Sequence, residues 1–235
     1  MSEYQYYEFQ AIDRPLSAKE MSELRSYSTR ARITTTSFIN HYEWGSFKGD
    51  ADLWMEKYFD AFLYLANWGT HVLKLSLPSR LLDPAMAKKY FGGDRAFFRE
   101  KADTVTLSFV SDDEESGEWE EGEGQLSSMI SVRAELARGD LRALYLGWLL
   151  RAQARELDDE DNEPPVPPGL GQLSASLESL ADFLRIDGDL LHVAAEASPP
   201  LGNSGVAGEE VRAWVEKRAL NWRDYLIEFA PRLFT

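Results

Sequence analysis

The sequence predicts an α+β protein, with a mixed or antiparallel sheet and packed helices in its N-terminal part and an all-helical C-terminal part. Two observations lead to this fold class. Strand-like segments occur only before residue 111, whereas every element predicted after residue 125 is a helix. The composition, 44% hydrophobic and 28% charged over 235 residues, is that of a globular chain with a substantial core.

The first three predicted elements form a β-α-β unit. Residues 3–12 are rich in Tyr and Phe and predict a strand. A helix is expected over 16–28, because Ser17 and Glu20 have the spacing of a capping box. Residues 31–44 are β-branched and aromatic, which predicts one long strand.

The next segments alternate between helix and strand. Apolar residues recur at helical spacing over 51–66, which favours an amphipathic helix. Leucines alternate with polar residues over 71–78, which is typical of a half-buried strand. A short helix at 84–91 and a strand at 104–110 follow.

The remaining predicted elements are helices. Gly139 and Asp140 separate the first two of them as a C-cap and an N-cap, so these two helices are expected to form an αα-hairpin. The predicted helices span residues 126–138, 141–157, 173–186, 187–198 and 209–230.

The expected domain organisation follows from one segment of unusual composition. Residues 158–171 contain four prolines and two glycines besides acids, and they are expected to form an extended, exposed linker. The linker would join a main α+β domain, residues 1–157, to a helical C-terminal part, residues 172–235. That C-terminal part either docks on the main domain or stands apart.

The formal net charge of −15 is concentrated in two segments. Residues 112–124 carry eight acids and residues 156–163 carry six, with no base in either. The rest of the chain has 26 acids and 25 Lys plus Arg, so it offers no basic face for phosphates. Direct binding of nucleic acid is therefore not expected.

Residues 41–52 contain the low-ranking catalytic candidates His41, Glu43, Asp50 and Asp52. The Gly-Ser followed by Asp-x-Asp suggests a nucleotidyltransferase, but in such enzymes the acidic pair lies further on and on a strand. A simpler interpretation is that Asp50 or Asp52 caps a helix. His41-x-Glu43 suggests a zinc deaminase, but that chemistry also needs cysteines, and the chain has none.

No cofactor or metal site is predicted. The sequence has no nucleophile elbow, P-loop or dinucleotide fingerprint, and its three scattered histidines are a poor basis for metal binding. The absence of cysteine also fits a reducing compartment.

Residues 112–124, called the acidic segment below, are the main candidate for an interaction site. The segment contains Trp119, and a large apolar ring among acids is costly to leave in water and is a common anchor in binding segments. Solvation alone is the simpler account of an acid run. The candidate interaction residues are Asp112, Asp113, Glu114, Glu115, Glu118, Trp119, Glu120, Glu121 and Glu123. The dense aromatic residues offer a second candidate, a buried or partner-binding face. They are Tyr4, Tyr6 and Tyr7 in the first predicted strand and Trp54, Tyr58, Phe59, Phe62, Tyr64 and Trp68.

Several blocks, among them YQYYEFQAIDRPLS, ARITTTSFINHYEWGSFKGD and LADFLRIDGDLLHVAAEASPPL, resemble a family of bacterial proteins of unknown function. The resemblance spans most of the chain. It implies a bacterial, cytoplasmic origin and no activity, cofactor or catalytic residue.

These observations favour a non-enzymatic interaction protein, an adaptor or regulator that binds a partner with a basic surface through the acidic segment or an aromatic-rich face. One alternative is an enzyme with a site near residues 41–52 that follows no known motif. Another is a subunit of a nucleic-acid-handling complex that touches no nucleic acid itself. Neither a leader nor a membrane-spanning stretch is recognisable, so a cytoplasmic location is expected.

Overall fold

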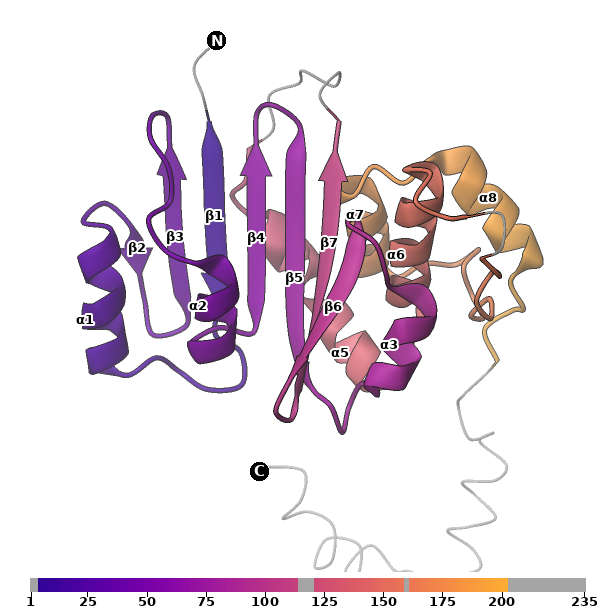
Figure 1. The fold of residues 1–235 in the computed structure, drawn as a ribbon, viewed down its shortest axis with the longest axis horizontal. Coiled ribbons are helices and arrows are strands. Elements are labelled where there is room, and N and C mark those ends of the chain that lie inside the picture. The colour runs from indigo at the N-terminus through magenta and orange to yellow at the C-terminus, as the bar shows by residue number, and fades with distance from the viewer. Residues whose placement is uncertain (1–3, 114–120, 159–160, 203–235) are drawn as a thin grey trace, which may run out of the picture. The chain divides into compact units, whose positions relative to one another are not determined.

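Seven strands of the computed structural model pair into one antiparallel sheet, in the order β2-β3-β1-β4-β5-β7-β6 (Figure 1). The structure describes residues 4–113, 121–158 and 161–202. The strands are β1 (Gln5–Gln10), β2 (Arg32–Ile33), β3 (Ser37–Tyr42), β4 (Ala61–Ala66), β5 (Thr70–Pro78), β6 (Ala96–Lys101) and β7 (Thr104–Asp112).

Helices cover both faces of this sheet. They are α1 (Ala18–Tyr27), α2 (Ala51–Lys57), α3 (Pro84–Tyr90), α4 (Gln125–Met129), α5 (Ser131–Ala137), α6 (Arg142–Gln153), α7 (Ala175–Phe183) and α8 (Gly188–Ala197). Figure 1 shows α2 in front of the sheet and α5 and α7 behind it. The α+β class predicted from the sequence is therefore confirmed, and the sheet is antiparallel.

Alternation along the strands divides the apolar residues between two cores. On the first face, Leu63, Leu73 and Phe109 are fully buried with residues of α3 to α8. On the second face, Phe9 and Phe62 pack with residues of α1 and α2. Successive side chains of a strand point to opposite faces, so neighbouring residues of β1 and β4 contribute to different cores.

The start of α1 agrees with the sequence prediction. The Ser17 hydroxyl accepts a hydrogen bond from the backbone N–H of Glu20 at 3.3 Å, and the Glu20 carboxylate accepts one from the N–H of Ser17 at 2.8 Å. This reciprocal capping box is a local feature, which is why the sequence alone reveals it.

The predicted helix over 51–66 is wrong in its second half. The helix ends at Lys57, and residues 61–66 form β4 in the middle of the sheet. A strand buried on both faces is a continuous apolar run without period 2, so it imitates a helical stripe. Between the helix and β4, the Asp60 carboxylate accepts hydrogen bonds from the backbone N–H groups of Ile12 at 2.6 Å and Asp13 at 2.9 Å.

Other predicted boundaries also change. The single strand expected over 31–44 is a hairpin of β2 and β3, in which the N–H of Thr34 donates to the carbonyl of Ser37 at 2.9 Å. The helix expected over 126–138 is divided into α4 and α5 at Ile130. β6 was not predicted from the sequence. It is an edge strand that ends in the charged residues Arg99, Glu100 and Lys101.

Every described element after β7 is a helix, and α7 and α8 share the first core with α6. The proline-rich residues 164–170, which precede α7, pack against this core. Leu170 is buried, and the Tyr90 hydroxyl donates to the carbonyl of Pro165 at 2.8 Å. Residues 1–200 form one compact unit. The predicted helix 209–230 lies outside the described residues.

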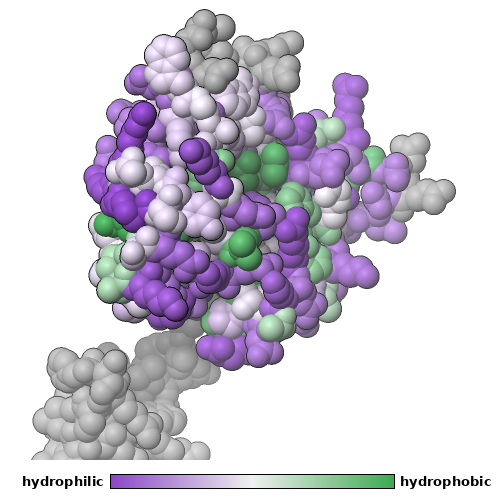
Figure 2. Space-filling model, turned by 60° about the vertical axis from the view of Figure 1, so that its left-hand side comes forward, coloured by the Kyte–Doolittle hydropathy of each residue, from purple (hydrophilic) through white to green (hydrophobic). Residues whose placement is uncertain are grey.

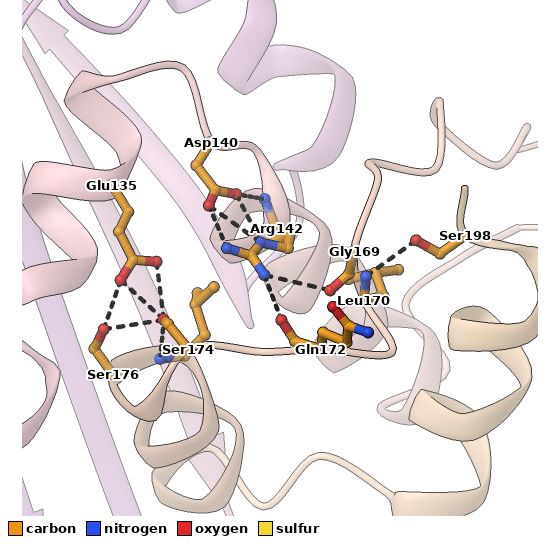
Figure 3. Close-up of polar contacts among 10 residues, drawn as sticks. Glu135, Asp140, Arg142, Gly169, Leu170, Gln172, Ser174, Ser176 and Ser198 are labelled. Atoms are coloured by element: carbon orange, nitrogen blue, oxygen red, sulfur yellow. Dashed lines mark hydrogen bonds and ion pairs between the residues drawn. The ribbon is translucent and has the colours of Figure 1, made fainter. Parts of the chain in front are cut away.

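A buried ionic network ties the proline-rich segment to the helices (Figure 3). The Arg142 guanidinium pairs with Asp140 at 2.6 Å and donates to the backbone carbonyls of Gly169 at 3.3 Å and Gln172 at 2.8 Å. Beside it, the Glu135 carboxylate accepts from the hydroxyl of Ser174 at 2.8 Å. The network connects α5 and α6 to the start of α7.

No helix in the described part of the chain is long and apolar enough to cross a membrane.

Candidate functional site

The strand register brings four chain segments to one end of the sheet. Gln5 lies between Tyr42 and Ala66, and Thr70 lies opposite Asp112. The start of β1, the end of β3, the β4–β5 turn and the end of β7 therefore meet at the upper end in Figure 1. The residues just beyond these strand ends, Tyr4, Trp44, Trp68, Asp112 and Asp113, are called the sheet-end rim below.

Two tryptophans of the rim are open to solvent. The exposed fraction is 79% for Trp44 and 43% for Trp68. Each is followed by a glycine with positive φ, +82° at Gly45 and +96° at Gly69, a conformation that glycine adopts without strain and that turns the chain sharply. The tryptophans follow β3 and β4, which flank β1, so the two strands that lead to them lie about 10 Å apart across the sheet.

The face of the molecule that carries α1 is mostly hydrophilic. Figure 2 shows the molecule from the side of α1, where hydrophobic residues form small, separate areas among hydrophilic ones. Single exposed apolar residues are normal on a protein surface, whereas large aromatic side chains held near each other at one end are typical of a binding surface.

The acidic segment begins at this rim. The Asp112 carboxylate accepts from the Arg95 guanidinium at 2.7 Å, and the backbone N–H of Asp113 donates to the carbonyl of Gly69 at 3.1 Å. The first acids are thus attached to the turn that carries Trp68.

The other end of the acidic segment is also attached to the sheet. A Cβ atom at Gly122 would lie 2.3 Å from the Tyr6 ring, so only glycine fits there. Glu123 pairs with Arg32 at 3.0 Å. Both ends of the segment have fixed places on the sheet. The intervening candidates Glu114, Glu115, Glu118, Trp119 and Glu120 lie outside the described residues.

Tyr4 links the rim to β3. Its ring stacks on His41 with centroids 6.5 Å apart, and its backbone N–H donates to the Asn67 side chain at 2.9 Å. Burial raises the pKa of Tyr4, and the carboxylates of Glu121 and Glu123 act in the same direction. The phenol therefore stays neutral at physiological pH beside the acidic segment.

The four catalytic candidates do not converge. Asp50 caps α2, because its carboxylate accepts from the N–H of Leu53 at 3.0 Å, as the simpler interpretation predicted. His41 lies opposite Tyr6, on the first face of the sheet, whereas Asp52 belongs to α2 on the second face. Glu43 is exposed just after β3. The sheet therefore separates the histidine from Asp52.

Among the described residues, no group of three or more His, Asp or Glu side chains has the arrangement of a metal site.

Comparison of the chain with protein-family models, with curated proteins and with solved structures gives no match.

Sequence reasoning selected four of the rim residues in separate groups but did not bring them together or select Trp44, because they come from separate strands whose pairing it did not predict. One local signal was present. Trp-Gly occurs at Trp44-Gly45 and again at Trp68-Gly69, each time directly after an aromatic-rich segment. An aromatic residue before a turn glycine, at the end of a strand, places a large ring where no further strand residue covers it.

Proposed function

We propose that this chain is a non-enzymatic interaction protein of the bacterial cytoplasm, an adaptor or regulator that binds a partner with a basic surface. The binding surface is the sheet-end rim together with the acidic segment. The observation that carries the proposal is the exposure of Trp44 and Trp68 at the end of the sheet where the acidic segment begins.

The two parts of this surface have different physical roles. Tryptophan is among the residues that contribute most to binding energy, because a rigid ring buries a large area with little loss of side-chain freedom. Clustered acids steer a basic partner and accelerate association more than they strengthen the final complex. The rim supplies anchors, and the acidic segment supplies attraction at a distance.

Purification from the native host followed by mass spectrometry tests this proposal. The matched pair of variants is Trp44→Ser/Trp68→Ser in the rim and Leu81→Ser/Val193→Ser elsewhere, since Leu81 and Val193 are also exposed apolar residues. One stoichiometric partner is expected with the wild type and the control pair, with affinity reduced at least about 30-fold by the rim pair.

Two results would overturn the proposal. One is a partner that the rim pair retains with wild-type affinity. The other is the absence of a stoichiometric partner from the wild-type chain under conditions in which the chain is abundant.

A further inference from the structure

The turn that carries Trp68 is contacted by an arginine that follows helix α7. The Arg185 guanidinium donates to the backbone carbonyl of Gly69 at 2.8 Å and to Nε2 of His71 at 2.9 Å. Gly69 closes the turn, because its N–H donates to the carbonyl of Ala66 at 3.0 Å. Residues at the end of α7 belong to the first core, so the arginine reaches the β4–β5 turn from the first face of the sheet.

His71 completes this connection from the start of β5. It is only 1% exposed, and its ring stacks on the Phe183 ring with centroids 4.6 Å apart. A guanidinium nitrogen can only donate, so Nε2 of His71 accepts from Arg185 and the ring hydrogen lies on Nδ1. Nδ1 donates to the carbonyl of Phe183 at 2.7 Å. The His71 ring therefore joins the end of α7 to the strand that leaves the turn.

Other contacts hold the same turn along the sheet. The backbone N–H of Asn67 donates to the carbonyl of Tyr4 at 3.0 Å, and the N–H of Asp113 donates to the carbonyl of Gly69 at 3.1 Å. Both bonds link the turn to neighbouring strands, in the hydrogen-bonding direction of the sheet. Arg185 approaches across that direction, from the first face. Its guanidinium therefore opposes a tilt of the turn out of the sheet.

The backbone of Arg185 is in a conformation that favours glycine. Its φ is +54°, at the position directly after the C-cap of α7. The N–H groups of Arg185 and Ile186 donate back to the last turn of the helix, each at 2.9 Å. Glycine is the usual residue at this place in a helix end. Unfavourable φ values persist where surrounding contacts enforce them, and they cluster at binding and regulatory sites.

We propose that Arg185 is a positioning residue of the sheet-end rim, which holds the Trp68 turn in the orientation that a partner binds. This inference rests on the proposed function, because it assigns a role within the same binding surface. It also connects that surface to the helices on the first face of the sheet, since the contact runs from the end of α7 to the Gly69 carbonyl.

Nuclear magnetic resonance of the tryptophan indole N–H groups in the full chain provides the first test. Trp68→Phe and Trp44→Phe assign the two signals of the rim. Arg185→Gly removes the guanidinium, and glycine tolerates the positive φ without strain. The Trp68 signal is expected to shift or broaden, whereas the Trp44 signal, from the other side of β1, is expected to stay unchanged.

Arg155→Gly is the matched control. Arg155 follows α6 as Arg185 follows α7, with a φ of +60°, and it is exposed. Both variants lose one positive charge and gain a glycine at a helix end, but the control is expected to leave the Trp68 signal unchanged. Arg185→Lys keeps the charge and lacks the planar group that reaches Gly69 and His71 together, so the same change as in Arg185→Gly is expected. Thermal melting of all three variants verifies that they fold.

Affinity for the partner recovered with the wild-type chain is the second test. Removal of a positive charge beside the acidic segment would by itself strengthen the attraction of a basic partner. A loss of affinity therefore separates positioning from electrostatics. Arg185→Gly is expected to weaken binding at least about tenfold, and Arg155→Gly to leave it within about twofold.

Two results would overturn this inference. One is a Trp68 signal that is the same in the wild type, Arg185→Gly and Arg185→Lys, whether or not a partner is found. The other is a changed signal with unchanged affinity for the recovered partner. A wild-type chain without any partner overturns the proposed function, and the Trp68 signal then still decides whether Arg185 holds the turn.

Discussion

Arg142 shows how one buried charge holds two distant chain segments together. Arg142 is only 6% exposed. Its guanidinium pairs with the Asp140 carboxylate and donates hydrogen bonds to two backbone carbonyls of the segment before α7 (Figure 3). Burial acts to raise the pKa of Asp140, but hydrogen bonds from Arg142 outweigh it and lower that pKa overall. The ionised pair is thus part of the native structure over the physiological range.

Replacement of Arg142 by Met is expected to lower the free energy of unfolding by about 3 kcal/mol, because the partly buried Asp140 would lose its partner and two backbone carbonyls would lose their donor. Urea denaturation measures the change. Arg138→Met, at an exposed position on the same hairpin, is the control and should cost about 0.5 kcal/mol or less. Equal effects of the two variants would show that the network has no special role.

Glu20 gives a pH dependence of defined sign. Hydrogen bonds from Arg14 and from Ser17 lower the pKa of Glu20 from 4.5 to about 2. A carboxylate whose folded-state pKa is depressed stabilises the fold above its unfolded-state pKa, and this contribution is lost as the pH falls from about 4.5 towards 2.

The difference in unfolding free energy between the wild type and Glu20→Gln is therefore expected to be constant above about pH 5 and to shrink below it. Solvent exposure keeps the difference small, about 1 kcal/mol or less. Thermal melts of both proteins between pH 2.5 and pH 7 measure it. A difference that grows on acidification contradicts the assignment.

Among the elements, β4 shows where prediction from sequence succeeds and where it fails. The capping box of α1 depends on residues three apart, so the sequence reveals it. β4 depends on β1 and β5, which lie beside it, and on cores at both faces. None of these neighbours is visible in a local window, and the apolar run was assigned to a helix.

The candidate sites follow the same division. The role of Asp50 as a helix cap is local and was predicted, whereas the rim is assembled by strand register. Asp52 was selected from the sequence as a catalytic candidate. Its partners Lys74 and Arg99 come from β5 and β6, and β6 had not been predicted at all.

The central position of β4 predicts a large effect of cavity formation there. Leu63→Ala removes a fully buried side chain and is expected to cost about 2–5 kcal/mol of unfolding free energy. The control Leu53→Ala, with a side chain that is half exposed on α2, should cost less than about 1 kcal/mol. Urea denaturation compares the two, and similar values would argue against a strand buried on both faces.

At the scale of the whole molecule, the charge is divided unevenly. Residues 112–124 carry eight acids and are attached at both ends, and residues 156–163 carry six, whereas the rest of the chain is nearly balanced. Long-range attraction of a basic partner would therefore originate from these two segments, and the larger of them begins at the sheet-end rim.

Replacing the eight acids of residues 112–124 with Asn and Gln tests this directly, once a partner is in hand. The association rate is expected to fall about tenfold or more at low salt, and its dependence on ionic strength to flatten, while the dissociation rate changes less. Stopped-flow measurements at several salt concentrations distinguish the two rates. An unchanged salt dependence would remove the acidic segment from the binding surface.

The two edges of the sheet have a further consequence. β2 is only two residues long, and β6 ends in three charged residues. Short strands and charged strands are poor templates for addition of another strand, so neither border favours growth of the sheet from molecule to molecule. Association by strand addition is thereby disfavoured, and so is the growth of a fibre built from such sheets. The proposed binding surface lies instead at the strand ends, where the backbone is already turning back.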